Sequence, residues 1–214
     1  MSMLRKVLVL PAFLAVIAIP IFSIAEEDIE DLIYIAKSDR KVTAVISGIH
    51  SSTIRLLPKE EVLWMDSVGK LGAMLTDHGF YIISDTSGSW RKFRLSSEES
   101  KAAIVTLSPL MALLATEDRA IGYNMLSNEF YETRLPLRDT IVALKSGENV
   151  AVLVMSSKVF GIKAKSSSFT EARLKIGETV EDVQVTKNKA TVRTSNRLLT
   201  FISTDSMWKA SILD

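Results

Sequence analysis

The sequence predicts an all-β protein of about five similar units, each made of four short antiparallel strands. Two separate markers recur with a period of about 39 residues, which indicates tandem repeats. Within each period, short β-branched and aromatic runs alternate with polar clusters, a pattern typical of strands joined by tight turns. Of the 214 residues, 47% are hydrophobic, which is the composition of a folded chain with a sizeable core.

The first 25 residues differ from the rest of the chain. Arg5 and Lys6 precede an uncharged apolar run over 7–22, small residues follow at 23 and 25, and acidic residues begin at 26. This order is typical of a secretory signal peptide. The alternative is an uncleaved membrane anchor, because the run approaches the roughly 20 residues that span a bilayer. We expect cleavage, which leaves 26–214 as the mature repeat domain.

Composition narrows the location and the class of function. The net charge is +1, and residues 1–25 carry two bases and no acids, so the mature chain has 24 bases against 25 acids. This balance argues against a dedicated nucleic-acid-binding protein. The chain has no Cys and no Asn-x-Ser/Thr sequence. An exported chain without disulfides or glycan sites fits the bacterial envelope, either periplasmic or secreted.

The first marker is a leucine that closes a short apolar and basic segment. The units end at Leu56, Leu95, Leu135, Leu174 and Leu213, and only the step from Leu95 to Leu135 is longer than the others, by a single position. The second marker is a polar tetrapeptide that usually ends in a base. It reads KSDR, TDHG, TEDR, MSSK and TSNR, beginning at positions 37, 76, 116, 155 and 194, and its second step is longer in the same way. Because two markers shift together by the same single position, chance is a poor explanation.

Each unit reads as four strands, which we name A to D in chain order. In the fourth unit an apolar run over 140–144 precedes three runs within 151–174, split by two polar clusters. The tetrapeptide then forms the turn between strands B and C, where short polar residues tolerate turn geometry. The segment 107–126 is rich in helix-forming Leu, Met and Ala. We predict strands there, because it aligns with its sister units at both markers.

Four antiparallel strands in about 39 residues resemble a blade of the β-propeller superfamily, of the WD40-like or quinoprotein-like kind, across residues 30–214. The resemblance is one of strand order and period, and the Trp-Asp and Gly-His pairs of WD40 blades are missing. It implies a small closed ring of about five blades without free sheet edges. The alternatives are a β-solenoid or part of a larger ring. Blade 1 lacks a clear A strand, because stepping back one period from Val62 reaches Ser23.

The last positions of the tetrapeptides suggest a charged face. In a propeller the B–C turns share one face with the D–A loops, which carry acids here, namely Glu60, Glu61, Glu98, Glu99, Asp139 and Glu178. One interpretation is salt bridging between neighbouring loops. The other is a surface for an anionic partner. On that second interpretation, the predicted partner-binding face consists of Arg40, His78, Arg119, Lys158 and Arg197.

Two further positions recur. The residue before the closing leucine is an arginine in four units and Ile212 in the fifth, which we interpret as charged protection of an outer strand. The fifth position before the leucine holds an aromatic residue in the last four units, and we expect it to pack between blades. The arginines are Arg55, Arg94, Arg134 and Arg173, and the aromatic residues are Trp90, Phe130, Phe169 and Trp208.

The sequence predicts no catalytic residues, no metal site and no cofactor. It has two histidines, no cysteine and no glycine-rich phosphate loop. The alternative is a channel-centred hydrolase of the glycosidase or lactonase type, using Asp66 with Glu181 or Asp182 on the innermost strands. We expect instead a non-enzymatic exported module that binds another envelope protein or an extracellular polymer. It would contact a membrane only through an uncleaved signal segment.

Overall fold

The computed structural model describes residues 32–48 and 50–213, so the predicted signal peptide lies outside the described residues. The described chain forms five antiparallel sheets, four of them four-stranded, with consecutive strands as neighbours. We call these sheets blades 1 to 5. The all-β prediction, the number of units and the strand order within each unit are confirmed.

The strand bounds follow the predicted units. Blade 1 contains β1 (Ile33–Ser38), β2 (Lys41–Ile46) and β3 (His50–Arg55). Blade 2 contains β4 (Val62–Val68), β5 (Leu71–Thr76), β6 (Gly79–Ser84) and β7 (Arg91–Arg94). Blade 3 contains β8 (Ile104–Leu107), β9 (Met111–Ala115), β10 (Arg119–Asn124) and β11 (Glu129–Arg134). Blade 4 contains β12 (Ile141–Ser146), β13 (Val150–Met155), β14 (Lys158–Lys163) and β15 (Thr170–Arg173). Blade 5 contains β16 (Val180–Val185), β17 (Lys189–Thr194), β18 (Arg197–Ile202) and β19 (Lys209–Ile212).

Three local features concern blades 1 to 3. The described part of blade 1 has three strands that correspond to B, C and D, so β1 takes the inner position and lies against β4. The segment 107–126, which is rich in helix-forming residues, forms β9 and β10 as predicted. Its apolar residues suit strands that are buried on both faces between neighbouring blades. A short helix, α1 (Ser97–Ala102), stands between blades 2 and 3, where the sequence predicts only a loop.

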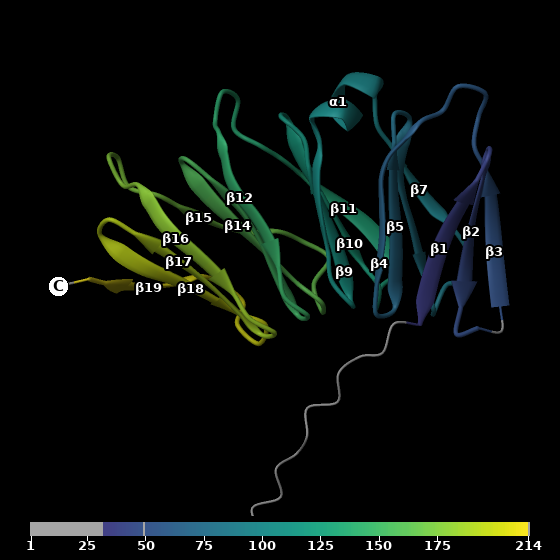
Figure 1. The fold of residues 1–214 in the computed structure, drawn as a ribbon. Helices are drawn as coiled ribbons and strands as arrows, with labels where there is room; N and C mark the ends of the chain where they lie inside the picture. Colours follow the sequence, from purple (N-terminus) through teal and green to yellow (C-terminus); the bar gives the residue numbers. More distant parts are fainter. Residues whose placement is uncertain (1–31, 49, 214) are drawn as a thin grey trace, which may run out of the picture.

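The five blades form an open arc. Figure 1 shows them side by side in chain order, with blade 1 and blade 5 at opposite ends. Four hydrophobic clusters hold the described residues together, and each joins two blades that follow one another in the chain. No cluster of the described residues joins blade 5 to blade 1, so the closed ring implied by the resemblance is not present in this part of the chain.

Burial patterns explain why the arc has ends. The central strands of blades 2 to 4 are buried almost continuously; β5 and β13, for example, have every residue buried. In the end blades, β2 (KVTAVI) and β17 (KATVRT) show an identical alternation of exposed and buried residues. A strand with one apolar face covers one neighbour and presents the other face to water. The end blades therefore resemble the capping units of repeat proteins.

The recurring aromatic residues pack between blades, as predicted. The indole N–H groups of Trp90 and Trp208 donate to backbone oxygens on the outer part of the preceding blade, over 3.2 and 3.0 Å. Phe130 packs against rings of blades 2 and 3, and Phe169 against Tyr131 and Phe160 of blades 3 and 4. Burial of ring area at every junction therefore holds successive blades in register.

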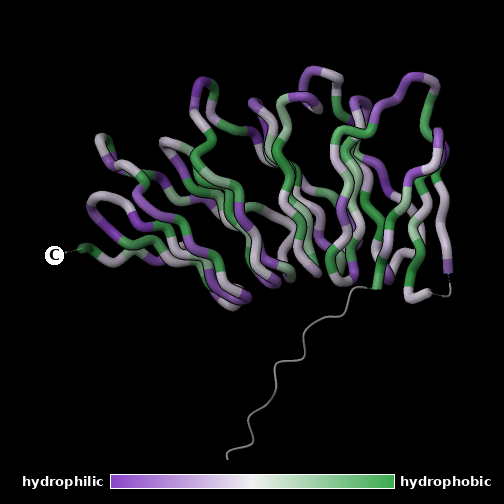
Figure 2. The backbone as a smooth tube through the Cα atoms, in the orientation of Figure 1, coloured by the Kyte–Doolittle hydropathy of each residue, from purple (hydrophilic) through white to green (hydrophobic). Residues whose placement is uncertain are grey.

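The ends of the strands define two faces. We call the side with the B–C turns and D–A loops the upper face, which is uppermost in Figure 1, and the side with the A–B and C–D connections the lower face. Figure 2 shows hydrophobic residues along the strands and hydrophilic ones gathered at the connections. No helix of the described residues has the length and hydropathy needed to cross a membrane.

Candidate functional site

Where the recurring tetrapeptide begins with threonine, in blades 2, 3 and 5, that first side chain closes the turn. In blade 5, Thr194 Oγ1 accepts from the backbone N–H of Arg197 (3.1 Å) and donates to the backbone oxygen of Arg197 (2.9 Å). Thr116 makes the same bonds to Arg119 in blade 3. Such hydroxyl-closed turns give the backbone groups partners that the strands do not supply. Turn geometry therefore explains why this motif recurs.

Blade 1 departs from the predicted register by one residue. Ser38 pairs with Lys41, so its turn consists of Asp39 and Arg40, with Asp39 in a left-handed conformation (φ 46°). Lys41, and not Arg40, occupies the position that corresponds to Arg119 in blade 3. The predicted alignment of Arg40 with the other turn bases is therefore shifted.

A second motif emerges four residues after each closing leucine. The acid there binds the B–C turn of the blade that follows it. Glu60 accepts from Thr76 Oγ1 (2.8 Å), Glu99 from Arg119 Nε (2.8 Å), Asp139 from the Ser156 and Ser157 hydroxyls, and Glu178 from Thr194 Oγ1. These four carboxylates tie each D–A loop to the neighbouring turn. The acids predicted on this face are thus mainly structural.

Three of the four D–A loops share one tight turn. The backbone N–H of the acid donates to the carbonyl three residues earlier, as from Glu178 to Lys175 (3.0 Å). The residue before the acid is left-handed, with φ of 69° at Lys59, 64° at Arg138 and 78° at Gly177. This geometry is that of a type II turn, whose second position here is Pro58, Leu137 or Ile176. The fourth loop is α1, in which Ser96 and Glu99 form a capping box.

The carboxylates of this motif are held ionised. Burial raises the pKa of Glu178, but hydrogen bonds from Arg197, the Lys175 backbone and Thr194 outweigh it and lower the pKa to about 2. The pKa values of Glu60, Glu99 and Asp139 are lowered from their usual range in the same way, with burial opposing and hydrogen bonds prevailing. Each carboxylate therefore binds its turn as an anion at neutral pH.

Most of the predicted partner-binding residues are engaged within the described chain. Arg119 pairs with Glu99 (2.8 Å) and Glu132 (3.0 Å), Lys158 with Glu171 (2.9 Å), and Arg197 with Glu178 (2.8 Å). His78 Nδ1 lies 2.8 Å from Asp77 Oδ1. The Arg40 side chain is exposed, with no ion-pair partner among the described residues. All five residues lie at B–C turns, but only Arg119 and Arg197 pair with acids of the D–A loops, as the salt-bridge interpretation describes, while Lys158 and His78 pair within their own blades.

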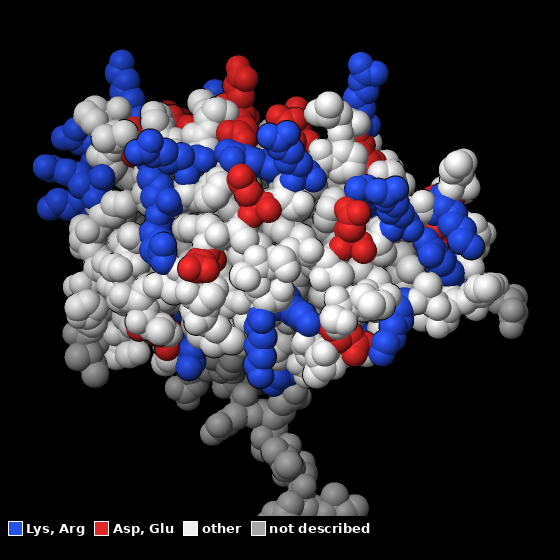
Figure 3. All heavy atoms as spheres, turned by 180° about the vertical axis from the view of Figure 1, so that it is seen from behind, with Lys and Arg blue, Asp and Glu red and all other residues white. Residues whose placement is uncertain are grey.

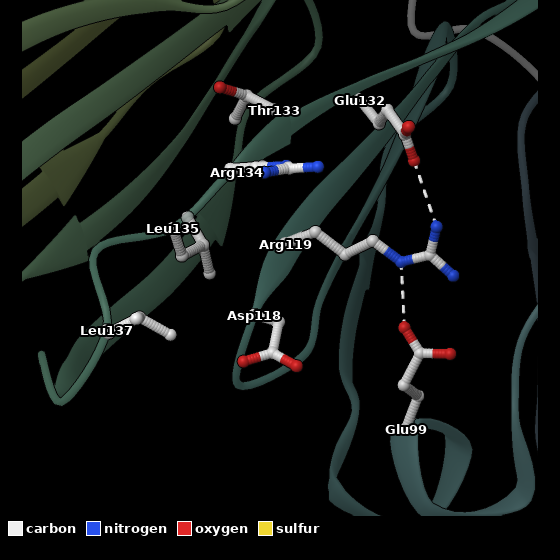
Figure 4. A pocket seen from close by; sticks show the side chains of 8 residues that line it. All are labelled: Glu99, Asp118, Arg119, Glu132, Thr133, Arg134, Leu135 and Leu137. Carbon is white, nitrogen blue, oxygen red and sulfur yellow. Dashed lines mark hydrogen bonds and ion pairs between the residues drawn. The ribbon is translucent and has the colours of Figure 1, made fainter.

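A hollow lies on the upper rim where blade 3 meets the loop to blade 4 (Figure 4). It has a volume of about 610 Å³, and the Arg119 side chain crosses one wall between Glu99 and Glu132. Leu137, at the second position of its type II turn, borders the hollow and is 82% exposed. The remaining lining residues are Asp118, Thr133, Arg134 and Leu135.

Two smaller hollows adjoin this one at the β9–β10 turn. One, of about 320 Å³, extends toward α1, and the other, of about 440 Å³, extends toward the loop before blade 4. Asp118 lines all three, and Glu117 lines both smaller ones. Together they form one uneven depression whose centre is the acidic tip of the β9–β10 turn. Figure 3, seen from behind, shows how basic and acidic side chains intermingle along this upper edge.

Sequence reasoning missed Leu137 and Asp118. Leu137 stands two residues after a closing leucine, where the equivalent Ile176 is also fully exposed. An apolar residue at the tip of a turn indicates an exposed apolar side chain. This signal can be recognised only when the type of the turn is known. Asp118 lies within a tetrapeptide of which only the last residue was considered for binding. The recurring arginines before the closing leucine are exposed, as expected of outer strands.

The carboxylates considered for a hydrolase lie on distant sheets. Asp66 is on β4 of blade 2, whereas Glu181 and Asp182 are on β16 of blade 5, and Figure 1 shows blades 3 and 4 between them. Glu181 is paired with Arg193 (2.8 Å). Within residues 32–48 and 50–213, no group of three or more His, Asp or Glu side chains is placed to hold a metal ion. The structure does not bring Asp66 together with either partner.

Comparisons with known proteins find only distant structural similarity. No protein-family profile and no curated protein matches the chain. Among solved structures, it resembles yeast RCC1 (Prp20; TM-score 0.43, 7% identity, 79% of this chain and 55% of that one). It also resembles PorZ of Porphyromonas gingivalis (0.42, 11%, 85% and 26%) and the WD40 domain of SCAP from fission yeast (0.37, 14%, 73% and 45%). The chain spans less than two thirds of each of these chains. The resemblance to β-propeller domains is one of blade architecture.

Proposed function

We propose that the chain is an exported, non-enzymatic interaction module of the bacterial envelope, and that a protein partner docks in the upper-rim hollow of blade 3. The observation that carries this proposal is Leu137, an 82% exposed leucine held at the border of a 610 Å³ hollow. A partner that covers this leucine would bury it as an apolar anchor in the hollow, which is how most interface energy is concentrated. Export is supported by the signal-peptide pattern of residues 1–25.

The loop that carries Leu137 is preorganised. Its turn is closed by a backbone hydrogen bond from Asp139 to Pro136 (3.3 Å), and Asp139 is in turn bound by both serines of the β13–β14 turn. A fixed apolar side chain loses little conformational entropy when a partner covers it. The geometry therefore favours binding over a structural role, because Leu137 contributes little burial to this chain.

The charge around the hollow indicates the partner's chemistry. Arg119 is neutralised by Glu99 and Glu132, Arg134 is an exposed base on the lining, and Glu117 and Asp118 form the exposed acidic tip of the turn. A partner segment with an apolar side chain next to a basic one would cover Leu137 and pair with the acidic tip of the turn. This proposal differs from the anionic partner considered from the sequence, because Arg119, Lys158 and Arg197 are engaged in ion pairs, although Arg40 has no such partner among the described residues.

The test compares matched variants at equivalent turn positions. Leu137→Asp and Ile176→Asp alter the same position of two type II turns, but only Leu137 lines the hollow. Asp118→Lys and Asn196→Lys likewise alter the third position of two B–C turns. In-cell crosslinking of the tagged protein, followed by mass spectrometry, should identify a partner with the native chain and both controls. Leu137→Asp and Asp118→Lys should lose it.

Two results would contradict the proposal. Equal capture by all four variants, each with an unchanged melting temperature, would exclude the hollow as the docking site. Recovery of the chain only from the cytoplasm with residues 1–25 intact would exclude export. The second result leaves the docking test unaffected, because the hollow lies wholly within the repeat domain.

A further inference from the structure

The lower face carries a second pocket, at the junction of blades 4 and 5. Its volume is about 450 Å³. Its polar lining comes from the A–B turns and C–D loops of the two blades and consists of Asn149, Lys163, Lys165, Asn188, Ser203 and Thr204. It lies at the opposite end of the strands from the upper-rim hollow.

Hydrogen bonds between the two blades fix the walls. The backbone N–H of Asn149 donates to the oxygen of Lys187 (2.8 Å), and Asn149 Nδ2 donates to Asn188 Oδ1 (2.7 Å). Lys163, the last residue of β14, reaches across with its ammonium to the backbone oxygen of Asp205. The pocket is therefore formed by packed elements of both blades, and it does not depend on one loop.

The lining is rich in donors and contains no carboxylate. Several donors of the lining have no acceptor in the described chain, namely the Lys165 ammonium, Asn188 Nδ2 and the hydroxyls of Ser203 and Thr204. Lys163 donates one of its three N–H groups to Asp205. The carboxylates adjoining the lining in sequence are already paired. Glu148 binds Lys187 (3.0 Å) and Asp205 binds Lys209 (2.9 Å). Two lysines therefore line the pocket, and no carboxylate is among its lining residues.

The repeat shows that the fold does not require polar residues at two of these positions, whereas Lys163 makes the cross-blade bond that Asn124 makes to Ser166 one period earlier. At the preceding junction, between blades 3 and 4, the positions equivalent to Asn149 and Lys165, one period earlier in the chain, hold Leu110 and Leu126. That junction forms the same strands with apolar residues at these places. Because Asn149 still bonds Asn188 across the junction, Lys165 is the residue that needs an explanation other than blade packing.

We propose that this pocket binds a phosphate group carried by a small organic molecule or by a unit of a polymer. A phosphate offers only acceptors and a negative charge, which matches two ammonium groups, an amide and two hydroxyls. Lysines contact phosphate as point charges without demanding the planar geometry that arginine prefers. A pocket of about 450 Å³ exceeds the size of a bare phosphate and admits the sugar or glycerol that carries it.

The first experiment titrates the ¹⁵N-labelled repeat domain with inorganic phosphate at constant ionic strength, with chloride as the balancing anion. The side-chain amide signals of Asn149 and Asn188 should shift saturably, together with backbone signals at 163–165 and 203–204. The double variant Lys163→Met/Lys165→Met should bind at least about tenfold more weakly, because two charge-assisted hydrogen bonds are lost. Lys70→Met, a lower-face control in blade 2 whose lysine pairs with Asp85 (3.8 Å), should bind as the native chain does.

The spectra of each variant also report whether it has folded. Linear shifts spread over many residues, or equal saturation in the double variant, would overturn the proposal. The source of the phosphate is distinguished by two further probes, glycerol 3-phosphate and vesicles of phosphatidylglycerol. Competition by glycerol 3-phosphate alone assigns a soluble ligand, and vesicle binding that the double variant loses assigns a headgroup. Failure of the upper-rim variants to alter partner capture has no bearing on this site.

Discussion

Arg197 Nε lies 2.8 Å from Oε1 of Glu178, a carboxylate whose side chain is fully buried. The pair joins the D–A loop that precedes blade 5 to the B–C turn of that blade. A second bond, from Nη2 to Oε2 (3.0 Å), makes it a fork that fixes both groups. The same loop-to-turn bond recurs in blades 2 to 4, with an arginine donor again in blade 3 and hydroxyl donors in blades 2 and 4.

Removing one member of this pair should destabilise the protein strongly. Glu178→Gln leaves the Arg197 guanidinium without its anion in a largely buried place, and breaking such pairs costs about 3–5 kcal/mol. Chemical denaturation measures the free energy of unfolding. Glu171→Gln, which removes the more exposed partner of Lys158, is the control and should cost less than about 1 kcal/mol. Similar losses in both variants would contradict the structural role of Glu178.

Stability should fall on acidification in a defined range. The folded pKa of Glu178 is about 2, below the value of about 4.3 expected in the unfolded chain, so the unfolded state binds the proton more readily. The resulting stabilisation, on the order of 3 kcal/mol, is complete above about pH 4.5 and is lost as the pH falls toward 2. Melting temperatures over this range should drop less steeply in Glu178→Gln. Parallel curves would show that this carboxylate is not the titrating group.

A single added methyl group should disturb the junction of blades 4 and 5. A Cβ at Gly161 of β14 would lie 2.7 Å from two ring carbons of Phe201, which is itself fully buried. We expect Gly161→Ala to cost about 1–3 kcal/mol of unfolding free energy, as overpacked core positions do. Gly161→Ala combined with Phe201→Leu should recover part of the loss. No recovery would mean that the strain lies in the backbone of β14.

One surface change should stabilise the fold. Arg138 adopts a φ of 64°, which costs a residue with a side chain more than glycine, and its counterpart Gly177 shows that glycine fits the same turn. Arg138→Gly should therefore be neutral or raise the unfolding free energy by up to about 1 kcal/mol, whereas Gly177→Arg should lower it. Calorimetry of the two variants measures whether their unfolding free energies change in different directions. A marked loss in Arg138→Gly would show that the arginine makes a contact that outweighs its conformation.

The spacing of the markers predicted the units, because the closing leucines and the turn residues meet requirements of burial and turn geometry that every blade shares. Leu56, Leu95 and Leu135 are buried, and Thr116 and Thr194 close their turns, so both markers report the same geometry. The open arc was harder to predict from the sequence. Its signal was the alternation in KVTAVI and KATVRT, which differs from the continuous apolar strands of the middle blades.

The candidate sites were harder to predict than the fold. The turn bases are conspicuous in the sequence, but Arg119 and Arg197 are occupied by acids that are 20 and 19 residues away in the chain. The upper-rim hollow depends on the direction in which a turn projects Leu137. The lower pocket joins residues that are far apart in the chain, such as Asn149 and Thr204, which only the stacking of blades brings together.

The open arc has a consequence for how the molecule loses structure. Each blade gains its buried area from its immediate neighbours, so among residues 32–48 and 50–213 the blades are held by a series of pairwise couplings, and no core cluster closes the arc. Blades 1 and 5 have one coupling each, while the three between them have two. Amide hydrogens of β2 and β17 should therefore exchange before those of β9 and β10, with opening that begins at either end and progresses inward. A ligand that spans the junction of blades 4 and 5 would slow that exchange at one end only.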